Sequence, residues 1–143
     1  MIIVALRGIN HSSRITPFMT TKTLTIIYWI STVLIILIMG FFAYGQIAQN
    51  NPHFLEEMAL FGFPLPFLKA LGFSKILGIV ALLVPGFPRI REWAYAGFAF
   101  TLLGAAFAHI DAGMYITPHW IFLAILLTSY FSWHKLNKNF KAH

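Results

Sequence analysis

Long apolar runs separated by short polar stretches make up most of this chain. None of the runs alternates between apolar and polar residues at period two, so the pattern favours helices over membrane-spanning strands. A helix needs about 20 apolar residues to cross the core of a bilayer. We therefore predict an all-α polytopic membrane protein, built as a bundle of four transmembrane helices. The predicted helices cover approximately residues 24–45, 65–84, 92–110 and 119–134.

Apolar residues make up 59% of the 143 residues, and charged residues make up only 10%. A soluble domain averages about 45–50% apolar and about 25% charged residues. A soluble chain of this length has too much surface for its volume to bury all of that apolar area, so lipid is its natural solvent. The net charge of +6 is not accompanied by aromatic residues among the lysines and arginines. That argues against nucleic acid and favours anionic lipid headgroups as partners.

Basic residues gather on one side of the predicted bundle. Four spans place the N-terminus, the 85–91 loop and the C-terminus on the same side of the membrane. The positive-inside rule then predicts that both termini are cytoplasmic, in a multi-pass protein of the bacterial inner membrane. The 47–64 loop and the 111–118 turn lie on the opposite side. The basic side carries Lys22, Arg89, Arg91, Lys135, Lys138 and Lys141, whereas the opposite side carries Glu56, Glu57, Asp111 and one lysine, Lys69.

The first eighteen residues do not fit the predicted membrane domain. The apolar run Ile2–Leu6 is too short for the core of a signal peptide. Met19 then precedes a short polar lead into the first long apolar run. We expect residues 1–18 to be a mis-called or disordered extension of a membrane domain at 19–143. The alternative is a short amphipathic tail on the membrane surface.

Small residues recur along the third predicted helix at spacings of three and four. Such a face lets a neighbouring helix approach closely, and bundle packing is sufficient to account for it. Gly72 and Gly78 offer the same opportunity on the second helix. The face of the third helix consists of Ala94, Gly97, Thr101, Gly104 and Ala108.

Two stretches carry a pattern that is specific in its spacing. The first is Gly-Phe-Pro at 62–64 leading into Leu-Gly-Phe-Ser-Lys-Ile-Leu-Gly at 71–78. The second is Arg-Glu-Trp-Ala-Tyr-Ala-Gly at 91–97, followed by Gly104-Ala105 and His109. Over roughly residues 20–135, these stretches resemble the DoxX-like family of small bacterial four-helix membrane proteins.

The resemblance implies a four-helix membrane fold and an analogy with quinone chemistry, because the family is named after a membrane subunit of a thiosulfate–quinone oxidoreductase. It thus implies an accessory subunit, with a quinone as cofactor and an oxidoreductase as partner. Vitamin-K-reductase-like four-helix proteins work through paired cysteines, and this chain contains no cysteine, so that mechanism does not apply. The family motif falls on Lys75, Gly78, Glu92, Trp93, Ala94, Tyr95, Ala96 and Gly97.

Lys75 is the deepest ionisable residue in the predicted spans, and such residues are costly and often functional. Helical side chains lean toward the N-terminus of their helix, so Lys75 is predicted to point toward the outer mouth of the bundle. There it can join other polar residues in a pocket for a quinone headgroup or a small anion. A structural lysine and ordinary interfacial hydration are the alternatives. The predicted outer pocket consists of Gln46, Lys69, Lys75, His109 and Asp111.

Glu92 is predicted to lie too far from Lys75 to pair with it. It is expected at the N-terminus of the third helix, where the helix dipole favours a carboxylate, in an ion pair with Arg89 or Arg91. His109, Asp111 and His119 are potential metal ligands, but their spacing matches no specific motif, so no metal site is predicted.

Three kinds of function stay open at this point. The first is an accessory membrane subunit linked to a quinone-dependent redox system. The second is a small-solute carrier that uses Lys75, in which a homo-oligomer supplies the pathway. The third is a structural or lipid-interacting protein without catalysis. The sequence contains no nucleophile–base constellation or phosphate loop that would assign a catalytic activity.

Overall fold

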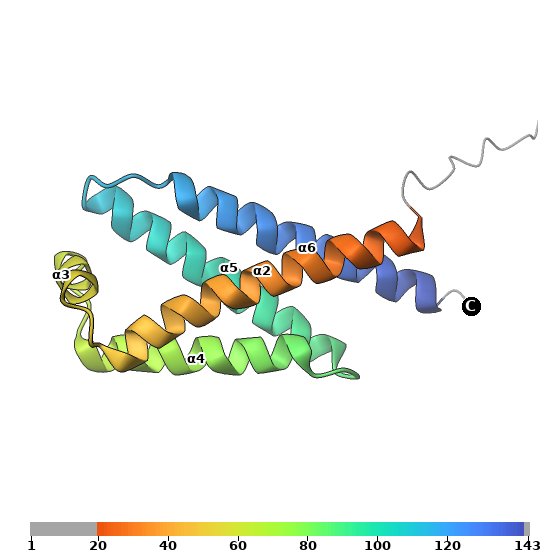
Figure 1. Cartoon of the computed structure of the whole chain (residues 1–143), viewed down its shortest axis with the longest axis horizontal. Helices are drawn as coiled ribbons and strands as arrows, with labels where there is room; N and C mark the ends of the chain where they lie inside the picture. Colours follow the sequence, from red (N-terminus) through yellow and green to blue (C-terminus); the bar gives the residue numbers. More distant parts are fainter. Residues whose placement is uncertain (1–19, 142–143) are drawn as a thin grey trace, which may run out of the picture.

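A computed structural model gives the positions of residues 20–141, with side chains described up to residue 138. Within these residues the chain forms helices and no strand, which confirms the predicted all-α fold (Figure 1). The predicted extension at 1–18 lies outside the described residues. The helices, in chain order, are α2 (Thr21–Ala48), α3 (Pro52–Leu60), α4 (Leu65–Leu83), α5 (Pro88–Asp111) and α6 (Thr117–Lys141).

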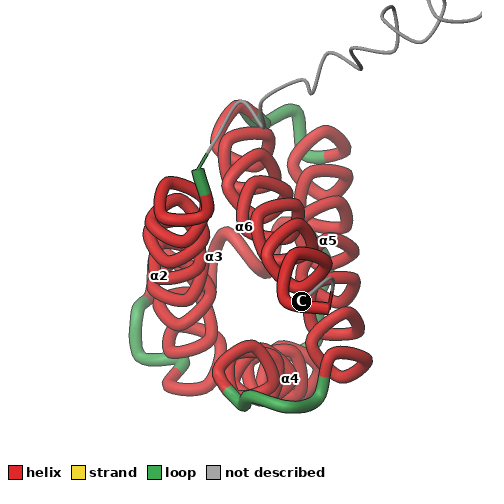
Figure 2. The backbone as a smooth tube through the Cα atoms, turned by 90° about the vertical axis from the view of Figure 1, so that its right-hand side faces the viewer, coloured by secondary structure: helices red, strands yellow, loops and turns green. Residues whose placement is uncertain are grey.

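The four long helices form a closed ring (Figure 2). Helices α2 and α5 each pack against both α4 and α6. The short helix α3 lies across one end of the bundle, which we call the α3 end (Figure 1). The start of α2, the α4–α5 turn and the end of α6 lie at the opposite end, which we call the termini end (Figure 1).

Helix α3 falls in the stretch 47–64, which was predicted to be a loop. Asn51 starts it: its side chain accepts hydrogen bonds from the backbone N–H groups of His53 and Phe54. Pro52 follows at the first helical position, where proline costs no backbone hydrogen bond. The sequence Asn51-Pro52 is therefore a typical signal for the start of a helix.

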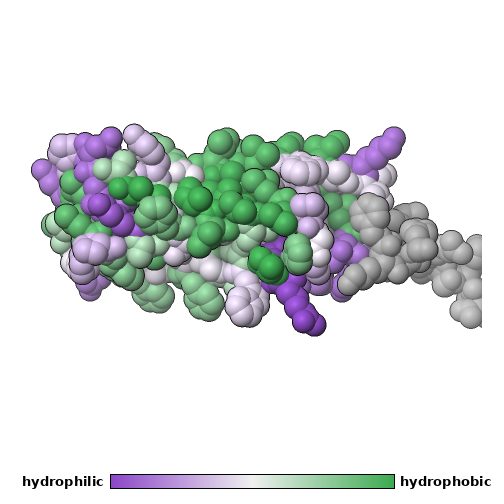
Figure 3. Space-filling view, turned by 90° about the horizontal axis from the view of Figure 1, so that it is seen from below, coloured by the Kyte–Doolittle hydropathy of each residue, from purple (hydrophilic) through white to green (hydrophobic). Residues whose placement is uncertain are grey.

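The surface of the bundle is that of a protein embedded in lipid. Helices α2, α4 and α5 are each long and apolar enough to cross a membrane. Large apolar side chains point outward along them, with Phe41 and Phe100 each 75% exposed. Figure 3 shows the resulting apolar band, with hydrophilic residues toward both ends. Helix α6 packs against α2 and α5 but is not among the three apolar spans, so its role as a fourth span stays a prediction.

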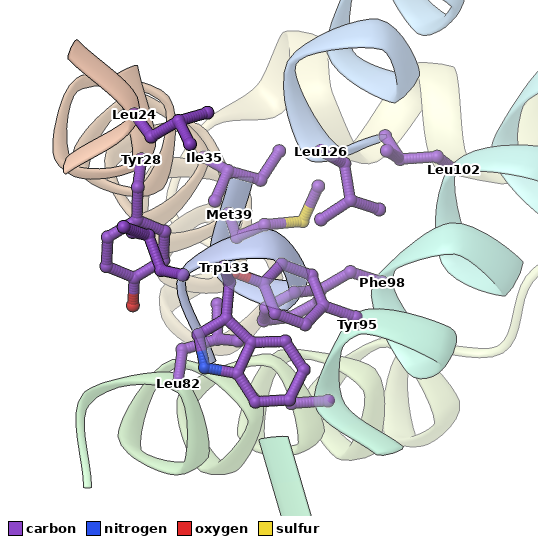
Figure 4. Close-up of a cluster of buried hydrophobic side chains, with 12 residues drawn as sticks. Leu24, Tyr28, Ile35, Met39, Leu82, Tyr95, Phe98, Leu102, Leu126 and Trp133 are labelled. Carbon is purple, nitrogen blue, oxygen red and sulfur yellow. The ribbon is translucent and has the colours of Figure 1, made fainter. Parts of the chain in front are cut away.

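The core consists mainly of side chains from α2, α5 and α6, with Leu82 of α4, and it combines apolar packing with one buried polar network (Figure 4). Ile35, Met39 and Leu126 are almost completely buried. Beside them, the Ser129 hydroxyl lies 2.7 Å from the hydroxyls of both Thr32 and Tyr95. These hydrogen bonds join three helices, so they fix the register of α2 and α5 against α6.

Glycines on α4, but not those on α5, allow neighbouring helices to approach closely. A Cβ on Gly72 would lie 2.7 Å from Ile47 Cγ1, and a Cβ on Gly78 would lie 2.7 Å from the ring of Phe98. Both positions therefore require glycine for α4 to contact α2 and α5. A Cβ on Gly97 or Gly104 would meet nothing within 4 Å. At these two positions the small-residue face of α5 is not filled by another described helix, contrary to the sequence interpretation.

Candidate functional site

Lys75 and Gln46 form a buried polar pair between α4 and α2. The Lys75 ammonium donates a hydrogen bond to Gln46 Oε1 over 2.6 Å. The two residues are only 5% and 8% exposed. Gly72 lies one turn before Lys75 and allows α4 to approach α2 at Ala43 and Gln46. The glycine therefore explains why a lysine on one helix reaches a glutamine on the next.

The Lys75 ammonium is incompletely satisfied by the described part of the protein. An ammonium has three N–H donors, and Gln46 Oε1 is its one hydrogen-bond acceptor among residues 20–138. No carboxylate in this range forms an ion pair with it. A buried charge without a counter-ion is expensive in a membrane and marks a candidate functional site.

A groove of about 400 Å³ runs between α4 and α5, with Lys75 on its wall. Leu77 and Trp93 also line it and are 71% and 81% exposed, so the groove opens on the lipid-facing surface of the bundle. Ser74 and Thr101 add hydroxyls to an otherwise apolar lining. The groove therefore suits a ligand that enters sideways from the bilayer. The rest of its lining is Leu71, Gly78, Ala81, Ile90, Ala94, Gly97 and Phe98.

Only part of the predicted outer pocket is brought together. Gln46 and Lys75 meet, as described above. Lys69 and Asp111 are exposed, and neither side chain has a hydrogen bond or ion pair within the described residues. His109 lies at the α3 end but contacts α3 instead of Lys75. The structure thus separates the predicted pocket into a buried pair, a histidine cluster and two solvated side chains.

His109 is the centre of a cluster that connects α3, α5 and α6. Its Nε2 lies 3.3 Å from Glu57 Oε1 on α3. Its ring centroid lies 4.7 Å from that of Phe61 and 4.3 Å from that of His119. The described residues contain no group of histidine, aspartate and glutamate side chains that could hold a metal ion.

Both ring nitrogens of His109 face a polar group. Its Nδ1 lies 2.8 Å from the backbone carbonyl oxygen of Ala105. A carbonyl oxygen only accepts, so Nδ1 carries a hydrogen. Nε2 faces the Glu57 carboxyl group, so the ring is held between its own helix and α3.

Glu57 and Phe61 were not predicted as site residues, because the 47–64 stretch was predicted to be a loop. They are four residues apart, so a helix places them on one face. Recognition of the Asn51-Pro52 start signal would have predicted that face. It would not have predicted which helix the face contacts.

A model of the DoxX-like family matches residues 30–132. This chain belongs to the DoxX-like family. The matched region includes Gln46, Lys75, and all of α4 and α5. No curated protein and no solved structure matches the chain.

In this DoxX-like protein, the string Glu92–Gly97 divides between the core and the lipid-facing surface. Ala94 and Tyr95 are buried, and Tyr95 reaches the Ser129 network. Trp93, Ala96 and Gly97 are exposed. The string therefore contributes to packing on one face of α5 and leaves the opposite face to lipid.

Glu92 lies further along its helix than predicted. Helix α5 begins at Pro88, so Glu92 lies beyond the first turn. It is exposed and forms no ion pair with a described residue. Arg91 instead donates from Nη2 to the Val84 carbonyl oxygen at the end of α4, over 3.2 Å. Its guanidinium carbon lies 5.6 Å from the centroid of the Trp133 ring, so Arg91 connects α4, α5 and α6.

Proposed function

We propose that this DoxX-like protein binds a lipid-soluble quinone and acts as an accessory membrane subunit of a quinone-dependent redox system. The observation that carries the proposal is the Lys75 ammonium. It is buried on the wall of a groove that opens to lipid, and it has one hydrogen-bond acceptor among the described residues.

The groove and the lysine match the two parts of a quinone. A quinone has a long apolar tail and a ring with carbonyl oxygens, which accept hydrogen bonds. The apolar lining between Leu77 and Trp93 suits the tail. The remaining N–H donors of Lys75 suit a ring carbonyl, and Gln46 holds the ammonium in place. The membership of the DoxX-like family supports the same chemistry by analogy.

The quinone content of purified protein tests this proposal. The protein is isolated from native membranes in mild detergent, and the quinone is extracted and quantified per polypeptide. Wild-type protein is expected to retain quinone, and Lys75→Met to retain about tenfold less, as for the loss of one charge-assisted hydrogen bond. Lys69→Met removes an exposed lysine from the same helix and is expected to behave like wild type. Wild-type protein without quinone, or equal retention by both variants, overturns the proposal.

We also propose that the termini end faces the cytoplasm and that the protein lies in the bacterial inner membrane. The excess of lysine and arginine at that end supports this orientation. Since the chain contains no cysteine, single cysteines report the side directly. In intact cells, a membrane-impermeant maleimide is expected to label Glu56→Cys but to spare Lys22→Cys. The reverse labelling would contradict the orientation.

A further inference from the structure

A second cleft lies at the termini end, away from Lys75. It has a volume of about 360 Å³ and lies between the beginning of α5 and the last turns of α6. Arg89 and Glu92 come from α5, and Lys138 comes from α6. Pro88, His134 and Asn137 complete the lining. The cleft thus contains charges of both signs where the helices reach the membrane surface.

These opposite charges do not neutralise one another. Within residues 20–138, the side chains of Arg89, Glu92 and Lys138 form no ion pair and no hydrogen bond. All three are exposed. Because they are not paired with one another, all three charged groups are available to a ligand. A ligand that carries both an anionic and a cationic group complements this arrangement.

The outer face of α5 next to the cleft is apolar. Trp93 directly follows Glu92 and is 81% exposed, and Phe100 lies two turns further along and is 75% exposed. An indole at the membrane surface and a phenyl ring below it suit the glycerol region and the acyl chains of a lipid. A ligand with a charged head in the cleft therefore finds an apolar surface for its chains.

We propose that this cleft binds a phospholipid whose head group carries both a phosphate and a primary ammonium. Arg89 and Lys138 donate hydrogen bonds to the phosphate, and the Glu92 carboxylate accepts a hydrogen bond from the ammonium. The phosphatidylglycerol head group lacks the ammonium, and the quaternary ammonium of phosphatidylcholine has no N–H to donate. The cleft and the Lys75 groove have no lining residue in common, although Trp93, which follows Glu92, lines the groove. Binding of the head group in the cleft does not depend on quinone binding. The ligand of the cleft is distinguished by Glu92, whereas a general attraction to anionic lipid would use only the lysine and the arginine.

Native mass spectrometry of lipid-loaded protein tests this inference. The protein is exchanged into nanodiscs with equal amounts of phosphatidylethanolamine, phosphatidylglycerol and phosphatidylcholine of matched chains, then released, and its retained lipids are identified. Wild-type protein is expected to retain phosphatidylethanolamine about tenfold over the other two lipids. Glu92→Gln is expected to lose that preference but to keep phosphate-dependent retention. Arg89→Gln combined with Lys138→Gln is expected to lose retention of all three lipids.

Lys135→Gln is the matched control, because Lys135 is an exposed lysine on α6 that does not line the cleft. It is expected to retain lipid as wild type does, and circular dichroism confirms that every variant is folded. Equal retention of phosphatidylglycerol and phosphatidylethanolamine by wild-type protein shows general anionic binding and overturns the proposal. A preference for phosphatidylethanolamine that survives in Glu92→Gln, or the absence of any retained lipid in wild-type protein, also overturns it.

Discussion

Ionisable side chains between the helices and those exposed at the termini end differ in their contacts. Between the helices, Lys75 bonds to Gln46 and His109 contacts Glu57. At the termini end, Arg89 and Glu92 extend from the first two turns of α5 without a described partner. The difference follows from burial, because a side chain away from water must find its partner inside the protein.

This difference separates two kinds of role. A buried polar pair fixes helix positions and presents a donor to a ligand in the bilayer. Exposed charges at a helix end contact lipid headgroups or water and contribute little to folding. Arg91 shows that the role of a charged side chain depends on its contacts and not on the end of the bundle at which it lies. It lies at the termini end, yet it bonds to the Val84 carbonyl oxygen and stacks near Trp133.

The largest effect on the free energy of unfolding is expected where α4 contacts α2, one turn before Lys75. In Gly72→Ala, the new Cβ would lie 3.0 Å from the Ala43 carbonyl oxygen, which is part of the backbone and cannot move alone. We expect a loss of about 1–3 kcal/mol in unfolding free energy from overpacking, measured by denaturation in mixed micelles. Gly104→Ala is the control, since its Cβ meets nothing within 4 Å. It is expected to be neutral or stabilising, and equal losses in both variants would contradict the contact.

The next effect tests the buried pair itself. Gln46→Leu removes the one described acceptor of Lys75, which leaves a buried ammonium unsatisfied at a cost of about 1–3 kcal/mol. Adding Lys75→Met is expected to restore most of that loss, because the double variant buries neither partner unpaired. Gln49→Leu serves as control, since Gln49 bonds to the Leu65 carbonyl in an exposed position. Additive effects of Gln46→Leu and Lys75→Met would show that the two side chains do not interact.

The positions of the predicted pocket residues along their helices were predictable from the sequence, but the directions of their side chains were not. Gln46, Lys69, Lys75, His109 and Asp111 were expected in one pocket because they lie near the same end of the spans. Successive residues of a helix are rotated by about 100°, so Lys69 points about 120° away from Lys75. Asp111 likewise points about 160° away from His109. These rotations are consistent with the separation of the predicted pocket into three parts.

The apolar runs were sufficient to predict the long helices, because a membrane span has a strong and simple pattern. Helix α3 has only nine residues. A short, half-polar segment of this kind contains no long apolar run, so it resembles a loop. The spacing of the small residues predicted a small-residue face on α5. It could not predict whether another helix of the same chain packs against that face. Gly97 and Gly104 have no neighbour within 4 Å of an added Cβ.

The middle of the bundle connects the two ends and should respond less strongly than the buried pair. Ser129→Ala removes hydrogen bonds to Thr32 and Tyr95. Hydrogen bonds between membrane helices average about 0.6 kcal/mol each, so we expect a loss of about 1 kcal/mol in unfolding free energy. Thr128→Ala is the neighbouring control, because the Thr128 hydroxyl bonds only to the Ala124 carbonyl of its own helix. If the two variants lose equal stability, the network does not hold the helices together.

The smallest effect concerns α3, whose attachment to α5 includes the contact of Glu57 with His109. The two side chains are partly exposed, at 15% and 27%, so their contact contributes only about 0.5 kcal/mol. His109→Phe keeps a ring against Phe61 and His119 but removes the contact with Glu57.

Amide hydrogen exchange of residues 52–60 measures this attachment. Protection is expected to be about twofold lower in His109→Phe than in wild-type protein. Equal protection in the two proteins would show that the contact between His109 and Glu57 does not hold α3 in place. The attachment of α3 would then rest on apolar contacts such as that of Phe54 with Gly45.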